Sequence, residues 1–140
     1  MVQNSSSTLA LRLIVAAALV DEERRILVQK RPQGKPLAGL WEFPGGKIEA
    51  GESPEDALVR ELQEELDIRV APAALVPFTF ASERLGDSHL VLMLYLVEQW
   101  EGTPQPLAAD RLRWCTIEEL ASLEMPPADV PLVARLSAGF

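Results

Sequence analysis

The sequence contains few of the side chains that soft metals and redox chemistry require. Its 140 residues include one cysteine, Cys115, and one histidine, His89. A single cysteine excludes a disulfide within the chain, and a zinc site is not expected where Cys and His do not cluster. Any metal that binds this chain should therefore be a hard cation held by oxygen ligands.

Positive charge is also scarce. Against 21 Asp and Glu there are only 13 Lys and Arg, which gives a formal net charge of −8. An acidic surface of this kind argues against direct nucleic-acid binding through the phosphate backbone. It still allows a small anionic substrate, provided that metal ions screen the negative charge.

Long hydrophobic runs are absent except for residues 9–20. This segment is too short to span a membrane, and Arg12 interrupts it. Residues 1–8 contain no Lys or Arg, which argues against a signal peptide. We therefore interpret residues 9–20 as a buried strand of a cytoplasmic protein that has no membrane partner.

The remaining composition is that of an ordinary globular protein, with 48% hydrophobic and 24% charged residues. We expect a disordered tail at residues 1–8 and a single domain at residues 9–140. Strands are expected at residues 11–20, 26–30, 68–81, 89–100 and 112–115, and helices at 53–66, 116–120 and 127–137. This mixture predicts an α/β (α+β) fold in which helices pack on a sheet.

The best-defined helix should begin at Ser53 and end near Leu66. Serine is a favourable N-cap residue, and Pro54 suits the first helical position. Leu58 and Leu62 share one face with Leu66, and this apolar stripe should face the core.

Glutamates occupy a different arc of the same helix. Spacings of three and four bring Glu61, Glu64 and Glu65 together, and Glu52 lies just before the helix. A divalent cation would turn their repulsion into coordination, and Arg60 is placed to hold a carboxylate in position. A solvated acidic face is the simpler interpretation of a glutamate run. The preceding Gly-Gly pair, where backbone can approach a ligand closely, favours the cation site.

The segment from Gly46 to Ile68, GKIEAGESPEDALVRELQEELDI, resembles the Nudix box, G-x5-E-x7-R-E-U-x-E-E-x-G-U, in which U is a bulky apolar residue. Every defined position agrees except Asp67, where the pattern has Gly. That position often needs a left-handed backbone, which Asp tolerates better than most residues.

The likeness extends to residues 41–49, 100–102 and 125–129, and it covers nearly the whole chain from about residue 10. Together these segments are similar to the bacterial MutT-type enzymes. That resemblance implies the Nudix fold, a mixed β-sheet between helices with the box as a loop–helix–loop. It also implies hydrolysis of oxidised guanine nucleotides, 8-oxo-dGTP above all, to the monophosphate and pyrophosphate.

The resemblance further implies a cofactor and a set of site residues. The cofactor would be Mg²⁺, for which Mn²⁺ can substitute. The metal ligands would be Gly45, through its carbonyl oxygen, Glu61, Glu64 and Glu65. Glu52 and Arg60 would support this catalytic site. The residues that bind substrate would be Arg31, Phe43, Gly46, Asp129 and His89.

Several of these positions also have a simpler interpretation. Asp129 stands where MutT-type enzymes often have Asn. Its carboxylate could accept from the N1–H and amine of guanine, or donate if protonated, but it could instead cap the last helix. Phe43 could pack in the core, and Arg31 and His89 could be surface residues.

A second departure from the family lies in the loop after residues 100–102. MutT-type enzymes often place another carboxylate there, whereas this chain has Ala108, and Asp110 is the nearest acid. Whether Asp110 replaces that carboxylate is open at this point.

Other functions are also compatible with the sequence. The enzyme could hydrolyse CTP or a modified pyrimidine triphosphate, or the domain could be a silent binding module or an acidic interaction domain. The full set of box glutamates argues against a silent module. The expected partner is a small nucleotide, and both a monomer and a homodimer remain open.

Overall fold

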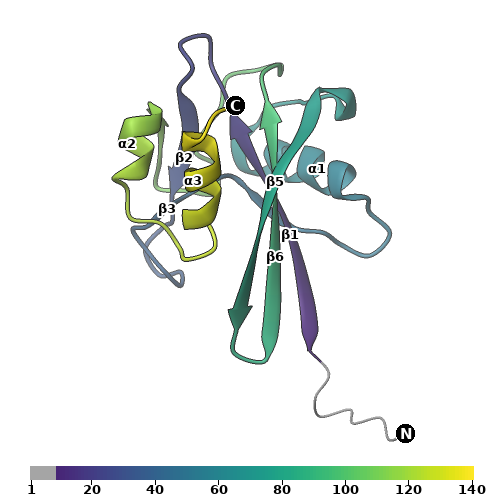
Figure 1. Ribbon diagram of the computed structural model, residues 1–140. Coiled ribbons are helices and arrows are strands. Elements are labelled where there is room, and N and C mark those ends of the chain that lie inside the picture. Colours follow the sequence, from purple (N-terminus) through teal and green to yellow (C-terminus); the bar gives the residue numbers. More distant parts are fainter. Residues whose placement is uncertain (1–8) are drawn as a thin grey trace, which may run out of the picture.

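The computed structural model describes residues 9–140, so the tail expected at residues 1–8 lies outside the described residues. Two β-sheets form the centre of the molecule, with helices on either side (Figure 1). The first sheet has the strand order β4-β1-β6-β5. Its strands are β1 (Ala10–Leu19), β4 (Gly45–Lys47), β5 (Leu75–Leu85) and β6 (Ser88–Val97). β1 and β6 are parallel, whereas the other neighbours are antiparallel.

The second sheet has the strand order β3-β2-β7. It contains β2 (Ile26–Lys30), β3 (Trp41–Glu42) and β7 (Arg111–Cys115), and all of its pairings are antiparallel. The mixed sheet between helices that the sequence predicts is therefore confirmed, although it is divided into two sheets.

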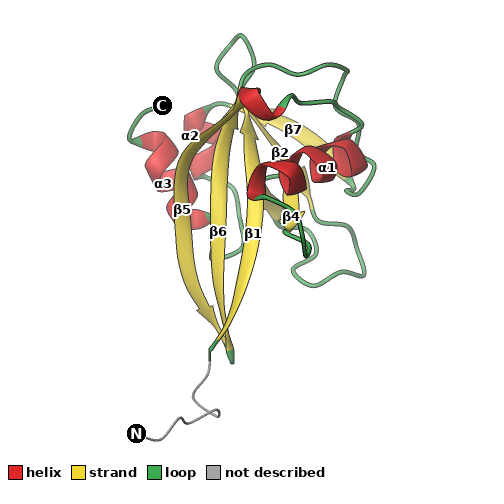
Figure 2. Ribbon diagram, turned by 90° about the vertical axis from the view of Figure 1, so that its right-hand side faces the viewer, coloured by secondary structure: helices red, strands yellow, loops and turns green. Residues whose placement is uncertain are grey.

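Alternation along β1 places helices on both faces of the first sheet. Val15, Ala17 and Leu19 share a buried cluster with the leucines of α1 (Pro54–Leu66). Ala16 and Ala18 face the other way, into a cluster with side chains of α2 (Ile117–Ala121) and α3 (Val130–Ser137). Figure 2 shows α1 and α3 on opposite sides of the strands.

Helix α1 forms as the sequence predicts. The Ser53 side chain accepts a hydrogen bond from the Asp56 N–H at 3.0 Å, and Leu58, Leu62 and Leu66 are each 0% exposed. The helix ends at Asp67, which has φ 57° and ψ 39°. This is the left-handed conformation that Gly adopts freely, so Asp67 keeps the geometry at a conformational cost of about 1 kcal/mol.

The strand predicted at residues 68–81 is wrong at both ends. Residues 68–74 contain one bridge, between Arg69 and Glu101, and the short 3-10 helix η2 (Pro72–Ala74). Pro72 begins this 3-10 turn, so the strand begins only at Leu75. Pro77 is tolerated within β5, because β5 is an edge strand and its register shifts between Pro77 and Thr79. At its other end the strand runs on to Leu85, because its polar residues are exposed on an edge strand and do not form a turn.

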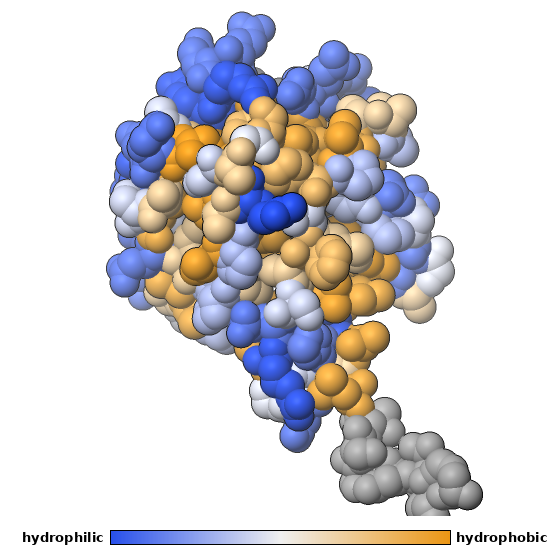
Figure 3. Space-filling model, in the orientation of Figure 1, coloured by the Kyte–Doolittle hydropathy of each residue, from blue (hydrophilic) through white to orange (hydrophobic). Residues whose placement is uncertain are grey.

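The long strands β1, β5 and β6 continue past the helices (Figure 2). Their free ends carry exposed apolar residues, among them Leu11, Leu13 and Leu85. Seen from the side of α3 and β5, hydrophobic side chains gather over the middle of the molecule and again at its foot (Figure 3). Within residues 9–140, no helix has the length and apolar character that crossing a membrane requires.

Candidate active site

A cavity of about 460 Å³ opens on the α3 face of the first sheet. Its walls are mainly apolar and come from β1, β6 and the loop before α3, with Ile14, Leu90 and Leu92 among them. Charged groups lie along its rim and inner end: Arg12, Arg31, Glu42, Lys47, Glu65 and Asp129. A largely apolar pocket with a few convergent polar groups is the usual form of a small-molecule site.

The double glycine lets helix α1 approach β4 closely. A Cβ atom at Gly46 would overlap the Glu61 carboxylate, and one at Gly45 would overlap the backbone of Val15. Gly45 also donates its N–H to Glu65 Oε1 at 3.3 Å. These glycines therefore place Glu61 and Glu65 against the backbone of β4, where Glu65 and both glycines line the cavity.

The surroundings of Glu65 disfavour the ionised form of its carboxyl group. Burial, together with the neighbouring Glu61, raises the pKa of its carboxyl to about 8. Hydrogen bonds from Gln29 Nε2, at 2.8 Å, and from the Gly45 N–H oppose this rise. Two adjacent carboxylates, one of them reluctant to ionise, form a site that gains from a bound cation.

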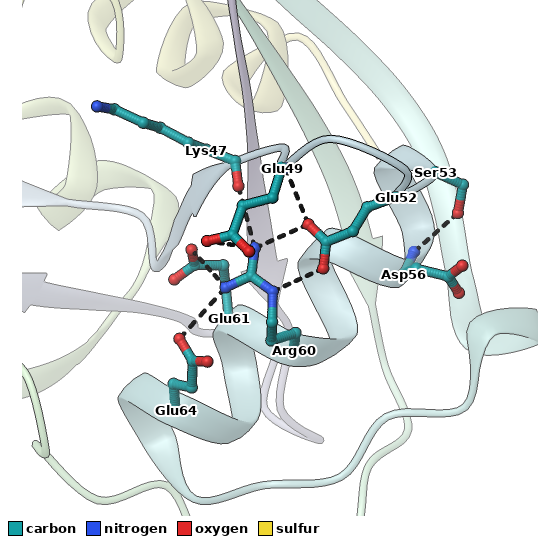
Figure 4. A network of polar contacts seen from close by, with 8 residues as sticks. All are labelled: Lys47, Glu49, Glu52, Ser53, Asp56, Arg60, Glu61 and Glu64. Carbon is teal, nitrogen blue, oxygen red and sulfur yellow. Dashed lines mark hydrogen bonds and ion pairs between the residues drawn. The ribbon is translucent and has the colours of Figure 1, made fainter.

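Arg60 connects helix α1 to the loop that precedes it through several hydrogen bonds (Figure 4). Its Nε and Nη2 donate to Glu52 at 2.7 and 2.9 Å, and Nη2 also donates to the Lys47 carbonyl at 3.2 Å. The paired hydrogen bonds from Arg60 lower the pKa of Glu52 to about 2. Nη1 lies 3.2 Å from Glu61 and 3.3 Å from Glu64, so one guanidinium screens the acids on both sides.

The structure brings together only part of the predicted metal-ligand set. Glu64 is 59% exposed and turns toward Arg60, and no three Asp, Glu, His or Cys side chains in residues 9–140 are grouped to hold an ion. Mg²⁺ does not need such a cage, because it binds one or two carboxylates and completes its coordination with water and phosphate. Glu61, Glu65 and the Gly45 carbonyl fit this requirement with oxygen donors alone.

Asp129 lines the inner end of the cavity and is 6% exposed. It immediately precedes α3, but its side chain makes no capping hydrogen bond, so the capping alternative is wrong. Instead its Oδ2 accepts from the Phe43 N–H at 3.3 Å. Burial, together with the nearby Glu42, raises the pKa of Asp129 to about 7.

Phe43 and Arg31 also line the cavity. Phe43 is 4% exposed and also belongs to the hydrophobic core, as the packing interpretation expected. Its contact with substrate stays a prediction. Arg31 Nη1 donates to Glu42 at 2.7 Å and its Nε donates to the Pro36 carbonyl at 2.7 Å. Because a guanidinium has five N–H groups, three remain available for a ligand.

His89 and Asp110 are not among the residues that line the cavity. His89 precedes Leu90 on β6, and alternation turns it to the opposite face, where it contacts Ser82. Its placement gives no support to the substrate-binding role expected from the sequence. Asp110 is exposed, and its backbone N–H donates to the Lys30 carbonyl at 3.1 Å.

Sequence reasoning missed Gln29 and Glu42. Gln29 is the polar member of the buried run from Ile26, and it lies on the same strand face as Leu27. A polar residue at a position that alternation assigns to the core was a usable signal. For Glu42 the signal was weaker, because β3 has only two residues and no alternation of polar and apolar positions can be recognised in it.

The raised pKa values of Glu65 and Asp129 predict how stability should depend on pH. Both groups bind a proton more tightly in the folded chain than at their ordinary values of 4.5 and 3.8. Stability should therefore fall as pH rises from about 4 to about 8, because the unfolded chain releases those protons earlier. Thermal unfolding in a chelating buffer would measure this fall. In Glu65→Gln the decline should be complete near pH 7, and a melting temperature that rises over this window would contradict the prediction.

Comparison with known proteins gives consistent matches. The NUDIX domain family model matches residues 10–136. An 8-oxo-dGTP diphosphatase of Escherichia coli is 37% identical over 126 residues, which are 89% of this chain and 96% of that protein. A CTP pyrophosphohydrolase of the same organism is 39% identical, over 89% of this chain and 90% of that protein. The solution structure of the E. coli ORF135 protein superposes with a TM-score of 0.83 at 34% identity, covering 93% of this chain and 91% of the other.

Proposed function

Because this chain belongs to the Nudix family of hydrolases, which act on phosphoric anhydrides, we propose that it is a magnesium-dependent nucleoside triphosphate pyrophosphohydrolase. The substrate is 8-oxo-dGTP, and the products are 8-oxo-dGMP and pyrophosphate. Removing this nucleotide from the cytoplasmic pool keeps it out of DNA and so avoids mutation. The E. coli relative named 8-oxo-dGTP diphosphatase supports this choice of substrate.

One observation carries the proposal: the Glu61 and Glu65 carboxylates meet the Gly45–Gly46 backbone beside a pocket whose inner end is Asp129. This arrangement separates two binding tasks along one cavity. The acidic end suits a cation with the phosphates that it screens, and the apolar end suits a base.

The chemistry follows from the residues at the acidic end. Glu61, Glu65 and the Gly45 carbonyl would hold Mg²⁺, which would supply the positive charge that orients an attacking water and neutralises the phosphates. A new P–O bond forms to the water oxygen as the anhydride P–O bond to pyrophosphate breaks. Arg60 keeps Glu61 and Glu52 in place, and the free N–H groups of Arg31 donate to phosphate oxygens.

The base lies between the apolar walls and Asp129. An ionised Asp129 offers acceptors to the N1–H and exocyclic amine of guanine. Its Oδ2 also accepts from Phe43, which fixes the direction of the carboxylate.

Hydrolysis of CTP is a second candidate, which the E. coli CTP pyrophosphohydrolase and Asp129 both favour. Cytosine presents one donor, N4–H₂, next to the acceptor N3. A protonated Asp129 would match this edge, since it can accept and donate at once. With a pKa of about 7, Asp129 can take either form near neutral pH.

A triphosphate panel tests the substrate. Pyrophosphate release from 8-oxo-dGTP, dGTP, dCTP and CTP would be measured with Mg²⁺ at one enzyme concentration. We expect kcat/KM for 8-oxo-dGTP to exceed that for CTP by about tenfold or more, since Asp129 meets different groups on the two bases and one well-made base contact is worth about 1–3 kcal/mol. The same preference over dGTP is expected from the E. coli relative alone, because Asp129 meets groups that both guanine nucleotides share. Preference for CTP would replace the first candidate with the second, and absence of any hydrolysis would contradict both.

A further inference from the structure

Gln29 is a buried amide in a strand that is otherwise apolar. It is 3% exposed and follows Ile26, Leu27 and Val28, each of which is 0% exposed. Its Nε2 donates to Glu65 Oε1 at 2.8 Å. Its Oε1 is buried without a hydrogen-bond partner among the described residues.

An unpartnered buried acceptor lowers the stability of the fold. An apolar side chain of similar length would fill the same space without that penalty, so the amide is poorly explained as a contribution to packing. What the amide does provide is one donor aimed at Glu65. The residue is therefore better explained by its effect on that carboxylate.

The hydrogen bond joins two parts of the molecule. Gln29 belongs to β2 in the second sheet, whereas Glu65 belongs to α1, which packs on the first sheet. Gly45, in β4 of the first sheet, donates to the same Oε1 at 3.3 Å. Two donors from different sheets fix this oxygen. Both donors engage Oε1, and the Glu61 carboxylate lies within hydrogen-bond reach of Glu65. A cation between the two carboxylates would replace that contact with coordination.

We propose that Gln29 is a positioning residue for the divalent-cation site. It acts through Glu65: it holds Oε1 and so directs the second carboxylate oxygen toward the cation beside Glu61. This role rests on the proposed function. Partners that orient a ligating carboxylate commonly contribute tenfold or more to metal affinity.

Gln29→Met tests the role, because methionine keeps the length of the side chain and removes the amide. Binding of Mn²⁺ alone would be followed by electron paramagnetic resonance, together with thermal unfolding in a chelating buffer. We expect the Kd for Mn²⁺ to rise about tenfold or more. The melting temperature should stay the same or increase, since the unpartnered acceptor is gone. The matched control is Gln63→Met on the exposed face of α1, which should change neither quantity.

A double-mutant cycle separates this role from a general packing effect. In a Glu65→Gln background, Gln29→Met should no longer change the Kd for Mn²⁺. An equal loss of affinity in both backgrounds would overturn the proposal, and so would an unchanged Kd with a lower melting temperature. Gln29→Leu repeats the measurement with a different shape. Wild-type protein that binds no Mn²⁺ would instead overturn the cation site itself.

Discussion

Glu61→Gln is expected to lower kcat for pyrophosphate release by about 10²- to 10⁴-fold, the scale on which charge-stabilising groups act in a preorganised site. The variant keeps the shape of the side chain and removes one of two adjacent negative charges. A neutral amide binds Mg²⁺ poorly, so raising the Mg²⁺ concentration should not restore the rate fully. Steady-state assays over a range of Mg²⁺ concentrations would measure both effects.

The fold should survive this change. Glu61 lies on the acidic arc of α1, away from the leucine stripe, and Arg60 keeps its paired hydrogen bonds to Glu52. Loss of the Glu61 charge also relieves its repulsion of Glu65, so the metal-free melting temperature should not fall. Glu22→Gln, at an exposed position in the turn before β2, is the matched control and should retain full activity. Near wild-type turnover in Glu61→Gln would remove Glu61 from the site.

The parts of this site that are contiguous in sequence were predictable. The box residues lie within one helix and the loop before it, so a spacing of four places Arg60 beside Glu64. The structure confirms that contact at 3.3 Å. Helix α1 was also predictable, because an N-cap, a proline and a leucine stripe all agree on it.

The parts that depend on tertiary packing were not predictable. Glu65 meets Gln29 only because two sheets join beside α1, and no local pattern records that junction. Asp129 could have been a helix cap until the structure placed the Phe43 N–H against its carboxylate. Edge strand β5 was misjudged for a related reason: its exposed polar residues look like a turn when the pairing with β6 is unknown.

Charge in this site is balanced in two different ways. Arg60 lowers the pKa of Glu52 and forms ion pairs with Glu61 and Glu64, which offset negative charge on that arc without a cation. Glu65 lies beside it, half-buried and with a raised pKa. This carboxylate therefore has the most to gain from a bound divalent ion, which explains why Gln29 and Gly45 both donate to it.

Asp129→Asn is expected to reverse the hydrogen-bonding character of the base end of the pocket. The Phe43 N–H donates to one carboxylate oxygen, and the amide oxygen of Asn can keep that bond. The side-chain NH₂ would then face the cavity in place of Oδ1. A donor replaces an acceptor at that point, while the size of the side chain stays almost the same.

This reversal should change substrate preference more than catalysis. For guanine, the amide can no longer accept from both N1–H and the exocyclic amine, and its NH₂ would have to pair with the acceptor O6, a combination open to the Asn that MutT-type enzymes often have here. We therefore expect kcat/KM for 8-oxo-dGTP to fall by about tenfold or less, because one contact replaces another. For cytosine, N3 would gain a donor, so kcat/KM for CTP should hold or rise and should lose its dependence on pH near 7. The Mg²⁺ concentration for half-maximal rate should not change.

Asp87→Asn, in the exposed turn between β5 and β6, is the control for charge alone and should leave both substrates unaffected. The ratio of the two kcat/KM values is the decisive quantity, because a general loss of stability would lower both together. A ratio that stays constant in Asp129→Asn would show that this carboxylate does not contact the base. The apolar walls and Arg12 at the rim would then have to account for base preference, and substitution of Arg12 would be the next measurement.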